Sequence, residues 1–281
     1  MDLLVGKDAP ADRAGDCSLQ WVQTRLSKPQ GLVFLPPLIG GSPAQQLNSF
    51  RWLIKNGLDL FSFNYSGHGD SAGKFSLGSS VEDTRRMLAI AASRAGKSGI
   101  PFFGIAACYA TIPMLYGALK SGEPFRKIVL INPLTTLYTG ALIKPFYHFC
   151  KTGFDLKRPV SSVKQSINRY LESLFPDIPR SLAGFGILSR KRTRILTVLA
   201  EWLSSGVNLN FSLPRTPALC VYGRQDPILN LGDDLKRAGL NRIKAVCSNV
   251  TFHAINSDHF FSDPESRATT RRAIRSFLLM G

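Results

Sequence analysis

The sequence predicts an α/β fold in which a mostly parallel, doubly wound sheet carries an inserted helical cap. Six short, nearly continuous apolar runs recur along the chain, each of strand length. Runs without in/out alternation are typical of parallel strands that are covered on both faces. Helical patterns separate several of these runs, which gives the strand–helix–strand alternation of a doubly wound sheet.

The expected strands are GLVFLPPL (31–38), LDLFSFNY (58–65), IPFFGIAA (100–107), KIVLINP (127–133), PALCVYG (217–223) and VTFHAIN (250–256). Apolar residues at helical spacing predict helices over 44–55 and 80–95.

The connection between the fourth and the fifth apolar run is much longer than the others. Roughly eighty residues separate the fourth apolar run from the fifth, far more than a crossover needs. The segment contains two helical patterns of its own, VKQSINRYLESLF and RTRILTVLAEWL. We therefore predict an α/β core made of residues 1–136 and 214–281, with a helical cap over 137–213.

Composition limits the class of protein. Of the 281 residues, 44% are hydrophobic and 19% charged, which is typical of a globular chain rather than a disordered one. No apolar run approaches the roughly 20 residues that span a bilayer, and the first residues lack a signal-peptide core, so we expect a cytoplasmic protein. The five cysteines are scattered and lack CxxC spacing, which predicts free thiols and neither a disulfide framework nor a metal site. No cofactor motif is found.

The formal charge of +16 predicts an anionic partner. The basic residues concentrate in 144–194 and in RATTRRAIRSF (267–277). An acidic acyl-carrier protein, the phosphates of coenzyme A or an anionic membrane surface would suit this charge. Nucleic acid is disfavoured, because the sequence has no zinc finger, interleaved aromatic platform or glycine-rich single-strand motif.

In an open α/β sheet the ligand lies outside the carboxyl ends of the strands, so the segments that follow the apolar runs are informative. These segments are VFLPPLIGG, NYSGHGDSAG, the strand-to-helix stretch PFFGIAACYATIPML, YGRQDPIL and NSDHFF. In this order they resemble the α/β-hydrolase superfamily over nearly the whole chain apart from the cap. The resemblance implies a nucleophile, an acid and a histidine in that chain order, and a structural role for His68.

The position of the nucleophile depends on how the strand-to-helix stretch is aligned with the family's G-x-S-x-G elbow. One register, beginning at Gly104, places Ala106 at the apex and leaves no nucleophile. The other register, beginning at Ala106, places Cys108 there, with small residues two before and two after. Starting the helix after Cys108 also moves Pro113 toward the first helical turn, where proline costs less.

The resemblance implies a catalytic triad of Cys108, His259 and Asp226, with the backbone N–H groups of Leu38 and Tyr109 as the oxyanion hole. Asp226 could instead serve as a turn-forming Asp-Pro, and His259 as a buried structural histidine. Asp258 is a poorer acid, because its side chain and that of the adjacent histidine diverge.

A cysteine nucleophile favours thioester substrates, because attack on a thioester exchanges one thioester for another at little free-energy cost. Within the superfamily the sequence is closest in style to acyl-carrier thioesterases of bacterial luminescence operons, which use serine. The predicted function is therefore an acyl-thioester hydrolase or acyltransferase. The alternatives are a catalytically silent binding protein of the same fold and a plain carboxylesterase.

Overall fold

The computed structural model describes residues 2–8, 18–38, 41–122, 124–134, 212–213, 215–226, 233–258 and 261–280. By its internal contacts the chain divides into two compact units, Met1–Thr136 with Val207–Gly281, and Leu137–Gly206. The predicted cap, except Ser212 and Leu213, lies outside the described residues, so it stays a prediction. Leu213 is buried and donates its backbone N–H to the Val246 carbonyl at 2.6 Å.

The core is an eight-stranded sheet in the order β1-β2-β4-β3-β5-β6-β7-β8. Its strands are β1 (Asp2–Asp8), β2 (Leu19–Arg25), β3 (Gly31–Leu35), β4 (Leu58–Phe63), β5 (Phe102–Ala107), β6 (Lys127–Ile131), β7 (Ala218–Gly223) and β8 (Val250–Ile255). β3 to β8 pair in parallel, whereas β1 and β2 run antiparallel at one edge. The six predicted strands and the mostly parallel sheet are confirmed.

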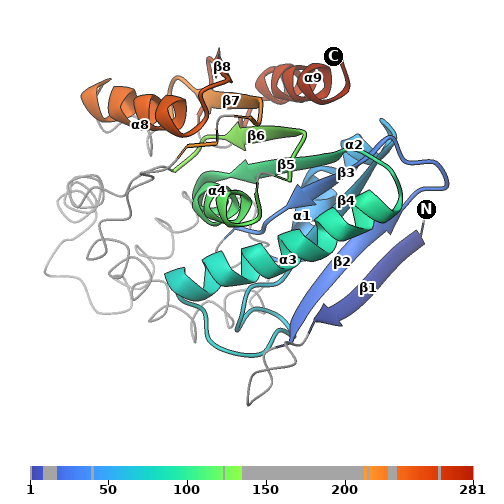
Figure 1. Ribbon diagram of the computed structural model, residues 1–281. Helices are drawn as coiled ribbons and strands as arrows, with labels where there is room; N and C mark the ends of the chain where they lie inside the picture. The colour runs from blue at the N-terminus through green and yellow to red at the C-terminus, as the bar shows by residue number, and fades with distance from the viewer. Residues whose placement is uncertain are drawn as a thin grey trace, which may run out of the picture. The chain divides into compact units, whose positions relative to one another are not determined.

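Helices cover both faces of this sheet (Figure 1). The helical elements are α1 (Pro43–Ser49), α2 (Arg51–Ile54), α3 (Leu77–Lys97), the 3-10 turn η1 (Cys108–Ala110), α4 (Thr111–Lys120), α8 (Asp233–Val246) and α9 (Pro264–Leu279). The helix expected over 44–55 is divided at Phe50, and the one expected over 80–95 lies within a longer α3. α3 and α4 pack on each other on the same face.

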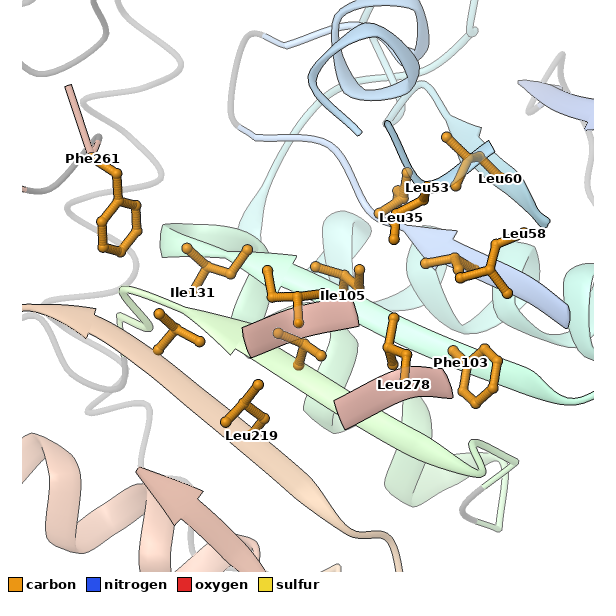
Figure 2. Close-up of a cluster of buried hydrophobic side chains, with 14 of the residues drawn as sticks. Leu35, Leu53, Leu58, Leu60, Phe103, Ile105, Ile131, Leu219, Phe261 and Leu278 are labelled. Carbon is orange, nitrogen blue, oxygen red and sulfur yellow. The ribbon is translucent and has the colours of Figure 1, made fainter. Parts of the chain in front are cut away.

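The two faces of the sheet bury different sets of side chains, because alternate residues of each strand point to opposite faces. On one face, a mostly aliphatic cluster from β3 to β8 packs with α2 and α9, where Leu53 and Leu278 join Leu35, Ile105 and Leu219 (Figure 2). On the other face several aromatic rings lie together: the Phe34 ring lies 5.7 Å from Phe63 and 6.2 Å from Phe125 between centroids. The strands are therefore buried on both sides, as their unbroken apolar sequences predict.

None of the helices in the described parts of the chain is both long enough and apolar enough to cross a bilayer.

Candidate active site

The turn from β5 into α4, at the carboxyl edge of the sheet, has an unusual backbone conformation. β5 ends at Ala107, and the next residue, Cys108, has a φ of +49°. This left-handed region is unfavourable for a residue with a Cβ, so such a residue marks a strained turn that its surroundings hold in place. Cys108 is about nine-tenths buried and begins η1, which leads directly into α4.

The other residues of this turn have the sizes that the turn requires. Ala106 lies inside β5, paired with Leu130 of β6, and is buried. Ala110, two residues after Cys108, is also fully buried. Pro113 is the third residue of α4, in the first turn, where a missing N–H costs little. Thus Cys108, and not Ala106, occupies the apex between strand and helix.

Two other buried cysteines lie outside this turn. Cys220 in β7 and Cys247 after α8 are buried and form no disulfide, like Cys108. Burial, with a smaller contribution from Cys247 nearby, raises the pKa of the Cys220 thiol to about 12. A thiol of that pKa stays protonated at neutral pH and is a poor nucleophile.

Asp226 follows the end of β7, two strands along the sheet from β5. Its side chain is completely buried. The segments after β7 and β8 are fastened together by two backbone hydrogen bonds, from Arg224 N–H to the Ile255 carbonyl (2.7 Å) and from Gln225 N–H to the Ser257 carbonyl (3.0 Å). The turn that carries Asp226 is therefore held against the segment that precedes His259.

His259 lies outside the described residues, but the residues on either side of its loop are placed. Asp258 accepts a hydrogen bond from Ser262 N–H at 3.0 Å and another from the Ser262 hydroxyl. Both oxygens of its carboxylate are therefore hydrogen-bonded to Ser262. Phe261 is buried at one end of the aliphatic cluster and has a φ of +49° (Figure 2). In the chain, α8 and β8 lie between Asp226 and this segment.

Gly223 makes the close approach between the two segments. A Cβ at this position would lie 2.4 Å from the Asp258 carbonyl oxygen and 2.5 Å from that of Ser257. Its N–H donates to the side-chain oxygen of Asn132 at 2.8 Å. Asn132 follows β6 with a φ of +42°, a conformation that asparagine tolerates better than most residues. Sequence reasoning missed Asn132, although an asparagine directly after a buried strand was a usable signal.

The loop with the Gly-His-Gly sequence is held by hydrogen bonds inside the protein. Both oxygens of the Asp83 carboxylate in α3 accept from Ser66, one from its N–H (2.8 Å) and one from its hydroxyl (2.9 Å). Burial raises the pKa of Asp83, and the Ser66 hydrogen bonds oppose that rise. His68 is buried against the rings of Tyr65 and Phe75, which agrees with the structural role implied for it. Nothing in the sequence had singled out Asp83.

The two expected oxyanion donors follow β3 and β5, which are neighbours in the sheet. Leu38 lies three residues beyond β3, and its carbonyl accepts from Gly41 N–H at 2.9 Å. Tyr109 directly follows Cys108 and is buried. Its phenol oxygen lies 2.6 Å from the Ser80 hydroxyl of α3.

Comparison with solved structures finds the same fold. Over 100% of this chain and 91% of the other, an esterase from Pyrococcus furiosus matches with a TM-score of 0.65 at 14% identity. Alpha/beta hydrolase domain-containing protein 10 from mouse matches over 98% of both chains (TM-score 0.60, 15% identity). A thermostable carboxyl esterase from Bacillus coagulans covers 99% and 98% of the two chains (TM-score 0.60, 15% identity).

No protein-family model and no curated protein matches the sequence. The structural likeness therefore defines the fold, which is the α/β-hydrolase fold, and the strand order of the sheet agrees with it.

Proposed function

We propose that this protein is an acyl-transfer enzyme that uses Cys108 as its nucleophile on acyl-thioesters. The observation that carries the proposal is the positive φ of Cys108 directly after β5. In α/β hydrolases the nucleophile stands on a strained strand-to-helix turn of this kind, with its side chain exposed at the top of the sheet. The names of the matched structures, esterases and hydrolases, are consistent with the same general chemistry.

The proposed triad is Cys108, His259 and Asp226. The ends of β5 and β7 are separated by two inter-strand spacings, or about 10 Å. One imidazole that is hydrogen-bonded on both sides spans such a gap between a thiol and a carboxylate. A buried Asp226 would fix the tautomer of His259 and stabilise the imidazolium that forms.

The first half-reaction transfers the acyl group to the enzyme. His259 takes the thiol proton of Cys108 as the sulfur attacks the carbonyl carbon, and the backbone N–H groups of Leu38 and Tyr109 bind the oxyanion. Collapse of the tetrahedral intermediate breaks the bond to the carrier sulfur, which leaves as a thiol with the proton from His259. The acyl-enzyme is itself a thioester, so this step is close to thermoneutral.

The second half-reaction decides the class of enzyme. Attack by water, with His259 as base, releases a carboxylic acid and regenerates the thiol. Attack by an alcohol or amine yields an ester or amide. The resemblance to carrier thioesterases and the net charge of +16 favour a substrate carried by an acidic carrier protein or by coenzyme A.

The test is acylation of the protein by a panel of acyl-thioesters, followed by intact mass. We expect one acyl group on the wild-type protein and none on Cys108→Ala. His259→Ala should slow its formation about 10²- to 10⁴-fold, the range for loss of a general base. Cys220→Ala is the matched control, because it removes another buried thiol and should leave acylation unchanged. Acyl transfer that survives Cys108→Ala would overturn the assignment.

A carboxylesterase is the second candidate, since the matched structures include esterases. Faster turnover of oxygen esters than of thioesters with the same acyl chain would favour it. Absence of any adduct and any turnover from a folded protein would favour a silent binding protein instead.

A further inference from the structure

A buried pair of hydroxyls connects α3 to the turn that carries Cys108. The Ser80 hydroxyl and the Tyr109 phenol lie 2.6 Å apart, and both side chains are buried. Tyr109 is the residue directly after Cys108, and its backbone N–H is one of the two proposed oxyanion donors. The contact thus joins α3 to the side chain of the residue whose backbone N–H is the proposed donor.

Ser80 is itself held firmly in place. It lies in the first turn of α3, which begins with a reciprocal capping box between Ser76 and Ser79. Thr84, one turn later, donates its hydroxyl to the Ser80 carbonyl at 2.7 Å. The neighbouring Asp83 is fastened to Ser66 by two hydrogen bonds. Ser80 is therefore a rigid point of attachment rather than a mobile surface group.

The turn at Cys108 needs such an attachment. A residue with a Cβ at positive φ tends to relax toward more favourable backbone angles unless its surroundings prevent it. Rotation of the backbone at Cys108 would change the direction of the next N–H, which belongs to Tyr109. Oxyanion donors act only within a narrow range of distance and angle, so a small rotation weakens catalysis without unfolding the protein.

We infer that the Ser80–Tyr109 hydroxyl pair is a positioning device that holds the Tyr109 backbone N–H in the orientation that binds the oxyanion. Ser80 and the Tyr109 side chain are positioning groups, because they act through the backbone and do not touch the reacting atoms. The oxyanion part of this inference depends on the proposed function.

Tyr65 provides a matched control for removal of the phenol oxygen. It is also a fully buried tyrosine, and its ring packs against Phe63 and Phe75. Its hydroxyl lies near that of Thr84 but has no partner within hydrogen-bond geometry among the described residues. Tyr65→Phe and Tyr109→Phe thus delete the same atom from two buried rings, and only the second removes the contact with the Ser80 hydroxyl.

The experiment compares two reactions of Cys108 in Tyr109→Phe, Ser80→Ala, Tyr65→Phe and the wild-type protein. Acylation by an acyl-thioester develops an oxyanion, whereas alkylation by iodoacetamide does not. We expect acylation to fall about tenfold in Tyr109→Phe and in Ser80→Ala, with little change in alkylation. Tyr65→Phe should match the wild type in both reactions. The double variant should lose no more than either single variant, because the two hydroxyls act as one unit.

Unchanged acylation in Tyr109→Phe and Ser80→Ala would overturn the inference. So would an equal fall in acylation and alkylation, because the pair would then act on the thiol or on the fold. Absence of an adduct in the wild type would count against the proposed function instead. Amide hydrogen exchange at Tyr109 would still test the positioning: it should be faster in Tyr109→Phe and Ser80→Ala than in Tyr65→Phe, and equal exchange in all of them would contradict it.

Discussion

Cys108 and Cys220 illustrate how position decides what one residue type does. Both are buried, but Cys220 lies in the middle of β7, which is paired on both sides, and burial raises the pKa of its thiol. Cys108 stands at the end of a strand in a conformation that costs free energy. Such strain persists when the packing around the turn stabilises the fold by more than the strain destabilises it. Here the small side chains of Ala106 and Ala110 leave room for the close approach of strand and helix.

Gly223 lies so close to the backbone after β8 that a side chain has no room there. We predict that Gly223→Ala lowers the free energy of unfolding by about 1–3 kcal/mol, because a Cβ would collide with backbone oxygens of Ser257 and Asp258. The displaced segment leads into His259, so acylation of Cys108 should slow as well. Urea unfolding and the acylation assay measure the two effects.

Gly96 in α3 is the control for that substitution, because a Cβ there meets nothing within 4 Å. Alanine at this helical position should stabilise the protein, by at most about 1 kcal/mol. If Gly223→Ala proved as stable as the wild type, the close approach between the two segments would not be a constraint.

Side-chain hydrogen bonds hold helix α9 at both of its ends. At its start Asp263 accepts a hydrogen bond from Ser266 N–H at 2.7 Å and one from the Ser257 hydroxyl at 3.0 Å. At its end Lys127 donates to the carbonyls of Phe277 and Met280, at 2.6 Å and 3.2 Å. The negative group at the N-terminus and the positive group at the C-terminus both suit the helix dipole. The loop of His259 leads directly into this capped helix.

The Asp263 cap should make stability depend on pH. Hydrogen bonds from Ser266, and a weaker contribution from Ser257, lower the pKa of Asp263 to about 2. The carboxyl pKa is near 3.9 in the unfolded chain, so the stabilisation is complete above about pH 4 and is lost as the pH falls through about 2. Asp263→Asn should flatten the dependence of Tm on pH in this window, since an amide can cap but does not titrate.

Thermal unfolding between pH 2 and pH 6 measures this effect. Asp263→Ala should lower Tm at pH 6, where the cap is intact in the wild type. An identical pH profile for Asp263→Asn and the wild type would mean that the carboxylate does not contribute to stability.

The whole molecule carries an excess of positive charge, and α9 displays a defined part of it. Four arginines lie exposed on this helix, and none of them forms an ion pair with a described residue: Arg267, Arg271, Arg272 and Arg275. The same helix buries Ile274 and Leu278 in the aliphatic cluster. Among the described residues of this helix, no large apolar side chain is exposed.

We predict that reversal of Arg267, Arg271 and Arg275 to glutamate weakens binding of an acidic acyl-carrier protein roughly tenfold at low salt. The loss should shrink as salt rises, because ions screen exposed charges. Titration calorimetry at two salt concentrations measures both effects. A control with the same change in net charge reverses Lys28, Lys97 and Lys120, and an equal loss in that variant would mean that net charge alone governs binding.

The sequence by itself determined the class of fold. Unbroken apolar runs predicted β3 to β8, because strands covered on both faces need apolar residues at every position. β1 and β2 were not predicted, since an edge pair with exposed Leu3 and Val5 lacks that pattern. The expected helix over 44–55 is divided at Phe50, where the backbone leaves the helical region with φ −104° and ψ 12°.

For the candidate site, sequence order was enough to predict that the nucleophile position and Asp226 follow two strands of the sheet, which the structure shows to be β5 and β7. The choice between Ala106 and Cys108 was open in the sequence, because both registers have small residues at the required spacing. The backbone angle at Cys108 and the location of Ala106 inside β5 come only from the tertiary structure. Ser80 and Asp83 act through contacts between elements distant in the chain, so no local pattern could identify them. Asn132 was missed although its position directly after a buried strand was a usable signal.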